Sequence, residues 1–344
     1  MINRLIVHGF KSIDNINIGF KNLNLLLGVN SSGKSTIIQS LLLASQNILN
    51  SEPNLNGNLV SMGDFRELRN LNTNAKLISI YIKDDTGNFA LLFNDLESSL
   101  KNNKFSESNI IFDKGLYYLS AARIGYMDTY EKNTKEIYKF GLQGEYCLSY
   151  FDKNLDKVLD EKLLIDNVSK TLEYNVNHWF DYIIGGRLNT EDIKQTDKLK
   201  AQFSGVSGIK VRTKNTGSGL SYIINIIIIC LSLEENQTII IENPEIHLHP
   251  KAQSRLTEFF IFISKSNRQL IIETHSDHFF NGLRASMANG KISDEEVGIN
   301  FLSLDDRNCT INTEIKISKR GRILDPPQDL FDQFEIDLDR MLGI

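Results

Sequence analysis

Apolar residues in the first 50 positions follow two spacings, one typical of strands and one typical of a helix. Residues 5–7 and 23–27 form short apolar runs that predict two strands, and the second run is apolar except for Asn24. A strand that is apolar on both faces is typical of the buried centre of a sheet. Residues 35–49 repeat their apolar positions at helical spacing, directly after a glycine-containing turn. The segment therefore predicts a strand, a glycine loop and a helix in succession.

Further elements are predicted along the rest of the chain. Residues 75–94 form two apolar runs around a polar turn and predict a hairpin. Residues 98–110, rich in Ser, Asn and Lys, predict a mobile loop, and residues 155–202 predict a largely helical segment. The last third predicts, in order, strand 209–213, a glycine turn at 217–219, a buried helix at 222–233, strand 238–242, helix 250–265, strand 268–273 and helix 276–288. Strands that alternate with helices indicate a doubly wound parallel sheet.

Composition and charge narrow the class of protein. Hydrophobic residues make up 41% of the 344 positions and the formal net charge is -5, which allows a large core and excludes a uniformly basic nucleic-acid sleeve. Cys147, Cys230 and Cys309 lack the spacing of a metal site and are expected to be reduced thiols. The apolar run 222–233 is shorter than the about 20 residues that span a bilayer. The N-terminus lacks signal-peptide anatomy, so we expect a cytoplasmic protein without membrane contact.

The turn between the predicted strand and helix carries the pattern G-x-x-x-x-G-K-S, from Gly28 to Ser35. Its glycines let the backbone wrap phosphates closely, and its N–H groups point at phosphate oxygens beside a helix N-terminus. Lys34 is expected to reach the β- and γ-phosphates, and the Ser35 hydroxyl to bind Mg²⁺. The pattern predicts ATP and Mg²⁺ as cofactors. The candidate nucleotide-binding residues are Gly28, Asn30, Ser31, Ser32, Gly33, Lys34, Ser35 and Thr36.

Two apolar strands of the last third end in polar residues. Residues 238–242 end in Glu242, and the carboxyl ends of parallel strands form the ligand-binding edge of an α/β sheet. Glu242 is therefore the candidate Mg²⁺ ligand, through water, and a candidate catalytic acid, with an ordinary strand end as the alternative. Residues 268–273 lead to His275, a candidate contact of the γ-phosphate, for which a structural histidine is the alternative.

A glycine-containing segment precedes the predicted buried helix. Backbone N–H groups at a helix start bind anions, and nearby hydroxyl groups add donors. The candidate nucleotide-binding residues of this segment are Gly217, Ser218, Gly219 and Ser221. A tight turn without a ligand is the alternative.

Two other sets of residues leave alternatives open. Lys210, Arg212 and Lys214 alternate, so a strand presents all three on one face, either to a nucleic-acid backbone or to solvent. The Lys-Arg-Gly-Arg run at 319–322 carries the same two interpretations. An alternative metal cluster is offered by four histidines, His247, His249, His275 and His278.

The order of these motifs resembles that of ABC ATPases, and three stretches are closer to one branch. Phe10–Ile13, Glu242–Pro250 and Glu273–Ser276 resemble the SMC/RecF-like ATPases of the OLD type, of the AAA family. That group includes ATPase subunits of bacterial anti-phage systems such as Septu, Gabija and PARIS. The resemblance covers most of residues 1–50 and 215–335.

This resemblance implies an ATPase that works as a head-to-tail homodimer with two ATP molecules at the interface. The segment Gly217–Ser221 of one copy then caps the γ-phosphate bound at Lys34 of the other. Lys11 and Ser12 lie near the adenine or the α-phosphate, and His275 takes the place of the switch histidine. A defence role further implies a separately encoded effector, such as a nuclease or a toxin, with DNA or RNA as a further class of partner.

Asn243 departs from the family pattern, in which a second acid follows the Walker-B acid. An amide cannot accept a proton in this role, so Glu245 is the candidate catalytic base in its place. The alternative is slow hydrolysis by a protein that acts as an ATP-held switch. The Q-loop glutamine of the family has no clear equivalent, and the segment around Arg123 is the nearest candidate.

The sequence thus predicts an α/β P-loop NTPase, an ABC-ATPase-like head with a mixed sheet, an inserted middle segment and no long coiled coil. We expect one composite domain at 1–330, with core segments 1–74 and 206–318 and an insertion at 75–205, and a C-terminal extension at 319–344. The expected function is that of the regulatory or sensor ATPase of an anti-phage complex. The alternatives are a DNA-repair or chromosome-maintenance ATPase that binds DNA itself, and the nucleotide-binding subunit of a membrane transporter.

Overall fold

The chain forms two compact units, which are described separately. One unit holds residues 1–112 and 284–344, and the other holds residues 113–283. The computed structural model describes residues 1–50, 52–95, 98–102, 109–166, 168–205, 209–212, 218–331 and 333–342, without the side chains of 98–102, 218 and 333–336.

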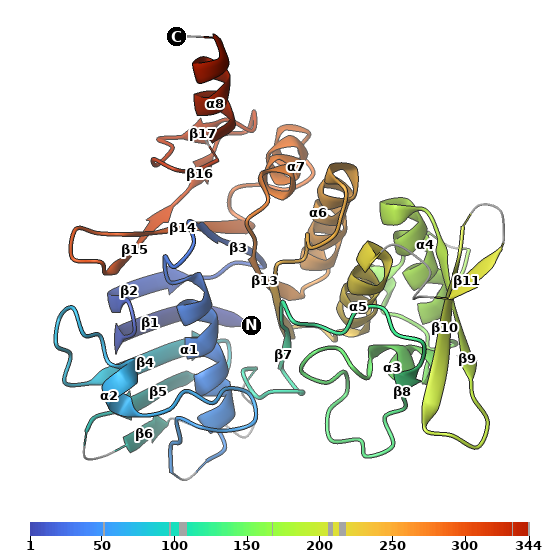
Figure 1. Cartoon of the computed structure of the whole chain (residues 1–344), viewed down its shortest axis with the longest axis horizontal. Helices are drawn as coiled ribbons and strands as arrows, with labels where there is room; N and C mark the ends of the chain where they lie inside the picture. The colour runs from blue at the N-terminus through green and yellow to red at the C-terminus, as the bar shows by residue number, and fades with distance from the viewer. Residues whose placement is uncertain are drawn as a thin grey trace. The chain divides into compact units, whose positions relative to one another are not determined.

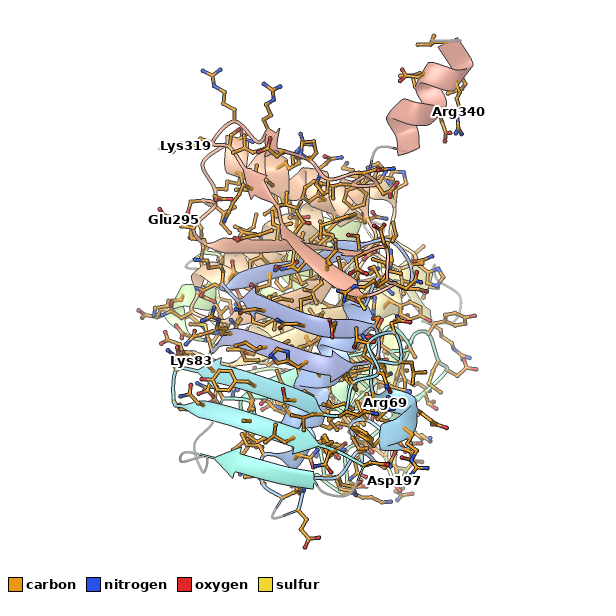
Figure 2. The ribbon with its side chains drawn as sticks, turned by 90° about the vertical axis from the view of Figure 1, so that its left-hand side faces the viewer. Arg69, Lys83, Asp197, Glu295, Lys319 and Arg340 are labelled. Atoms are coloured by element: carbon orange, nitrogen blue, oxygen red, sulfur yellow. The ribbon has the colours of Figure 1, made fainter. Side chains whose placement is uncertain are left out.

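An antiparallel sheet fills much of the first unit. Its strand order is β2-β1-β4-β5-β6, formed by β1 (Ile2–Phe10), β2 (Ile13–Gly19), β4 (Ile78–Asp84), β5 (Asn88–Phe93) and β6 (Ser98–Asn102). Alternate residues of β1, β2, β4 and β5 are buried, as expected of strands that face a core on one side. Helix α1 (Lys34–Asn47) lies across the buried face (Figure 1). Figure 2 shows the other face, with exposed Lys83 near the end of β4.

The P-loop of this unit follows a strand that is buried on both sides. Strand β3 (Leu23–Gly28) is buried except at its last residue and pairs in parallel with β14 (Val297–Leu304), which confirms the predicted central strand. Strand β15 (Thr310–Glu314) pairs antiparallel with β14. The remaining elements of this unit are α2 (Phe65–Leu68), β16 (Lys316–Ile317), β17 (Ile323–Leu324) and α8 (Gln333–Leu342).

The second unit contains a parallel sheet with the order β7-β12-β13. It comprises β7 (Leu116–Leu119), β12 (Thr238–Glu242) and β13 (Gln269–Glu273), and its register aligns Glu242 with Glu273. Helix α4 (Leu172–Ile184) contacts both α5 (Ser218–Ser232) and α6 (Pro250–Lys265), as Figure 1 shows. Apart from Leu220 and Tyr222, which are partly exposed, the apolar side chains of α5 are buried, which confirms the predicted buried helix.

The described residues also form a small antiparallel sheet and three further helical segments. Strand β10 (Lys198–Ser204) pairs with β8 (Tyr130–Glu131), β9 (Arg187–Asp192) and β11 (Lys210–Arg212). The helical segments are α3 (Cys147–Lys153), the 3-10 turn Glu161–Leu163 and α7 (Asp277–Ala288), which follows β13. Among the described residues, no helix combines the length and apolar composition needed to cross a membrane.

Three local predictions were wrong. The N-terminal segment contains a third strand, β2, whose outward positions are polar. Residues 98–102 form strand β6 rather than loop, and residues 103–108 lie outside the description. The predicted helical segment 155–202 contains the β9–β10 hairpin after α4. Alternate residues of β10 are buried, as in a strand that covers a core, and the Phe203 ring stacks on the Phe180 ring of α4 with the ring centres 5.2 Å apart. The predicted domain boundaries stay a prediction.

Candidate functional site

The P-loop of the first unit has a backbone that only small residues fit. Gly28, Ser31 and Gly33 have φ values of 141°, 62° and 102°, all within the positive range that favours glycine. A Cβ at Gly28 would lie 2.1 Å from the Leu302 carbonyl oxygen. A Cβ at Gly33 would lie 2.4 Å from Oγ1 of Thr310. The two glycines of the motif are therefore required by close contacts with β14 and β15.

Lys34 begins α1 and folds back on the loop before it. Its ammonium donates hydrogen bonds to the carbonyl oxygens of Gly28 at 2.8 Å and Val29 at 2.7 Å, and the side chain is 4% exposed. The Ser32 hydroxyl is fully buried and has no hydrogen-bond partner in the described part of the chain. Buried polar atoms are normally paired, so this orphan hydroxyl fits a cradle that takes a polar ligand such as phosphate.

Other predicted residues of the motif lie around this cradle. Asn30, Ser31 and Ser35 are exposed, whereas Thr36 is buried in the first turn of α1. Ser35 is thus an exposed residue at the helix start, where the P-loop pattern expects a Mg²⁺ ligand.

Lys11 and Ser12 both lie beside the P-loop helix. The Lys11 ammonium donates to Oε1 of Gln39 on α1 at 2.7 Å, and burial lowers the pKa of this lysine. The Ser12 hydroxyl accepts a hydrogen bond from Thr310 at 2.8 Å, and the Thr310 N–H donates to the Ser12 carbonyl at 2.7 Å. Thr310 thus connects Ser12 with Gly33, a contact that sequence analysis missed because it joins distant segments.

In the second unit, Glu242 ends β12 with its carboxylate held by backbone. The Ala121 N–H donates to Oε2 of Glu242 at 3.0 Å. Burial, and then the Glu242 carboxylate, raise the pKa of Tyr118 on β7, so this phenol stays protonated at neutral pH. Glu242 keeps partial solvent exposure, which a carboxylate needs to bind a metal ion through water.

Arg123 holds the backbone that follows β12. The side chain is 2% exposed, and its guanidinium donates to the carbonyl oxygens of Glu242 and Asn243, both at 2.8 Å. It also lies 5.5 Å from the centre of the Tyr222 ring. Burial lowers the pKa of Arg123 to about 10, so it is charged at neutral pH. The nearest Q-loop candidate is therefore a buried clamp on the segment Glu242–Pro250, which is called the Walker-B segment below.

Replacing Arg123 with alanine is expected to destabilise the protein by about 2–4 kcal/mol, because two carbonyls lose a charged donor. Urea unfolding measures this loss. A matched control is Arg268→Ala, which removes another buried arginine whose guanidinium donates to the Leu233 carbonyl and to Asp160. Both variants should unfold more easily, but only Arg123→Ala should change nucleotide turnover per folded molecule. If both variants kept the wild-type turnover per folded molecule, Arg123 would have no role in positioning Glu242.

Glu245 joins the Walker-B segment to the end of β13. Its Oε1 accepts a hydrogen bond from the His275 N–H at 2.8 Å, and its Oε2 is buried without a partner in the described residues. Asn243 has a φ of 43°, and its N–H donates to the Glu273 carbonyl at 2.8 Å. The His275 side chain is exposed. The structure therefore brings Glu245 and the His275 backbone together and leaves one buried carboxylate oxygen of Glu245 without a described partner.

The predicted signature segment lies at the start of α5. Gly217 and the side chain of Ser218 lie outside the description. A Cβ at Gly219 would lie 2.5 Å from the His247 carbonyl oxygen, so this position has no room for a side chain. The Ser221 hydroxyl is buried and finds no partner among the described residues. The Tyr222 ring lies 5.1 Å from the His247 ring and so links α5 to the Walker-B segment.

The histidines considered as metal ligands have other environments. The side chain of His249 accepts a hydrogen bond from the Lys251 N–H at 3.3 Å and so caps the N-terminus of α6. Within the described ranges, no three His, Cys, Asp or Glu side chains are grouped to hold a metal ion.

Comparison with known proteins supports an ATPase. Residues 125–280 match the AAA ATPase domain family, and residues 292–341 match a family of proteins of unknown function (DUF3696). An Smc head domain with an extended coiled coil, bound to the C-terminal domain of ScpA and derived from Pyrococcus furiosus, matches at a TM-score of 0.60 and 14% identity over 99% of both chains. The chain has the P-loop ATPase fold of SMC heads.

Two further solved structures agree with this fold. An Smc head bound to the C-winged-helix domain of ScpA has a TM-score of 0.56 and 16% identity, over 92% of this chain and 98% of that chain. The SMC head domain from Thermotoga maritima has a TM-score of 0.50 and 12% identity, over 92% of this chain and 99% of that chain. No curated protein matches the chain significantly. The predicted fold class, an α/β P-loop NTPase with an ABC-ATPase-like head and a mixed sheet, is confirmed, and the described residues contain no long coiled coil.

Proposed function

We propose that this protein binds ATP with Mg²⁺ and hydrolyses the nucleotide. The observation that carries the proposal is the P-loop, where left-handed backbone and the orphan Ser32 hydroxyl form a cradle at the start of α1. Lys34 exchanges its two carbonyl partners for β- and γ-phosphate oxygens. Ser35 would bind Mg²⁺ directly, and Glu242 would bind it through water. Bound Mg²⁺ supplies positive charge that offsets the charge of the leaving phosphate.

The proposed working state is an ATP-dependent head-to-tail homodimer. In it, the segment Gly217–Ser221 of one copy faces the nucleotide held at Lys34 of the other. The buried Ser221 hydroxyl without a described partner supports a polar ligand at this helix start.

A Glu242→Gln variant tests this function. It is expected to keep ATP affinity but to lower hydrolysis at least about tenfold, because an amide is a weaker partner than a carboxylate for hydrated Mg²⁺. Phosphate release measures turnover, and sedimentation with ATP measures the dimer, which should accumulate in the variant. Exposed Glu234, changed to Gln, is the charge-matched control. If both variants hydrolyse ATP at the wild-type rate, Glu242 does not serve as the Walker-B acid.

We further propose that the ATPase regulates an anti-phage defence complex with a separately encoded effector such as a nuclease or a toxin. The resemblance of Glu242–Pro250 and Glu273–Ser276 to OLD-type ATPases supports this role. The second candidate is an ATPase of DNA repair or chromosome maintenance, which the exposed Lys200, Lys210 and Arg212 of the β10–β11 pair favour. Tight, salt-sensitive binding of duplex DNA by the purified chain alone separates the second candidate from the first.

A further inference from the structure

The second unit carries a groove with an apolar floor and a basic rim. Its volume is about 520 Å³, within the range of pockets that take a ligand or several side chains. It is lined by Ile183, Ile184, Leu220 and Leu248, with Lys251 and Arg255 as its charged residues. Among the residues that the structure describes, no acidic side chain lines it. The Arg255 guanidinium is held over the Tyr182 ring at 4.8 Å, so the basic rim is preformed.

Helix α8 has an exposed apolar side with acidic residues beside it, which complements the apolar floor and basic rim of the groove. Leu338, Met341 and Leu342 are 39%, 75% and 64% exposed, and their spacing places them on one side of the helix. Asp337 and Asp339 flank this apolar side, and Arg340 lies opposite and pairs with Asp337 at 3.3 Å. A helix of 10 residues is too short to be stable alone in water, where about 12–15 residues are marginal. Its exposed apolar side therefore requires a partner surface.

We propose that α8 of one copy binds in this groove of a second copy. The apolar side of α8 covers the floor, and its aspartates meet Lys251 and Arg255 on the rim. Every copy carries both the helix and the groove, so a reciprocal exchange between two copies closes into a two-fold dimer without a leftover binding surface. This contact requires no nucleotide. Gly219 and His247 also line the groove, so the bound helix lies next to the segment assigned to the nucleotide of the other copy.

Cross-linking between single-cysteine additions tests the contact. One population carries Lys251→Cys in the groove, and the other carries Leu342→Cys on the apolar side of α8. The native cysteines are all buried, so a short bismaleimide should react with the added thiols. We expect a cross-linked dimer from the mixture without nucleotide. Adding Met341→Asp to the α8 partner should remove it, because the new carboxylate would be buried on the groove floor.

Arg340→Cys is the matched control, since it lies on the same helix but on the opposite side. Equal products from Arg340→Cys and Leu342→Cys, or none from either, would overturn the proposal. A chain that carries both Lys251→Cys and Leu342→Cys and cross-links only within itself would also overturn it, because the occupant would then be the same copy. Repeating the mixture in a Lys34→Ala background should leave the product unchanged, so loss of nucleotide binding is distinguished from loss of this contact.

Discussion

A Lys34→Ala variant is expected to lose ATP affinity by at least about a hundredfold. The ammonium is buried in the loop, where it bonds to two backbone carbonyls, and the P-loop pattern assigns it to the β- and γ-phosphates. A hydrogen bond to a charged group contributes about 1.5–3 kcal/mol, and two such bonds are lost. Because about 1.4 kcal/mol changes affinity tenfold, the loss amounts to two orders of magnitude or more. Calorimetric titration with Mg²⁺ and ATP measures it.

The control for this variant must account for the loop itself. Alanine leaves the carbonyls of Gly28 and Val29 without their present donor, so part of the effect belongs to the free protein. Unfolding of Lys34→Ala and of the exposed Lys21→Ala variant should therefore be compared before affinity is interpreted. Wild-type affinity in a folded Lys34→Ala protein would exclude the assigned P-loop role.

Glu245→Gln is expected to slow hydrolysis by about a hundredfold or more, because a general base contributes about 10²–10⁴ in rate. Its Oε1 already accepts the His275 N–H, and its buried Oε2 has no partner in the described chain. Glutamine can still accept the His275 N–H with its amide oxygen, but it cannot accept a proton from water. Single-turnover hydrolysis on preformed dimers measures the chemical step apart from assembly.

Comparison with Glu245→Ala separates catalysis from positioning. If Glu245 is the base, glutamine and alanine should be similarly slow, while ATP affinity stays near the wild-type value. If Glu245 only holds the His275 backbone, glutamine should keep most of the activity and alanine should lose it. A fast Glu245→Gln enzyme would therefore assign Glu245 to positioning and leave Asn243 beside a site without an acidic base.

The P-loop and its flanking elements were predictable because their signals are local. Gly28 and Gly33 mark conformations that the residue type itself allows, and the apolar run of β3 marks burial on both sides. The sequence missed β2, since its polar outward residues dilute a strand pattern of only seven positions. The β9–β10 hairpin was also missed, because the lysines that alternate with apolar residues in β10 resemble the charged face of a helix.

Roles that depend on burial could not be obtained from residue order. Nothing local marks Arg123 as a buried clamp, because its carbonyl partners lie about 120 positions away. The same holds for Glu245, whose link to the His275 backbone spans 30 positions. The sequence placed both residues near the site by resemblance and spacing, whereas their hydrogen bonds follow from how β7, β12 and β13 lie side by side.

The walls of the P-loop also have a consequence for synthesis on the ribosome. Leu302 and Thr310 close the loop against Gly28 and Gly33, and Thr310 bonds to Ser12 across 298 positions. At about 5–20 residues per second, a ribosome needs about 15–60 s to travel from Ser12 to Thr310. During that interval the glycine loop of the nascent chain lacks its contacts with Leu302 and Thr310, on which the proposed nucleotide binding depends. The nucleotide binding proposed for this loop is therefore expected to arise late in synthesis, and a chain released before Thr310 lacks the contacts that this residue makes.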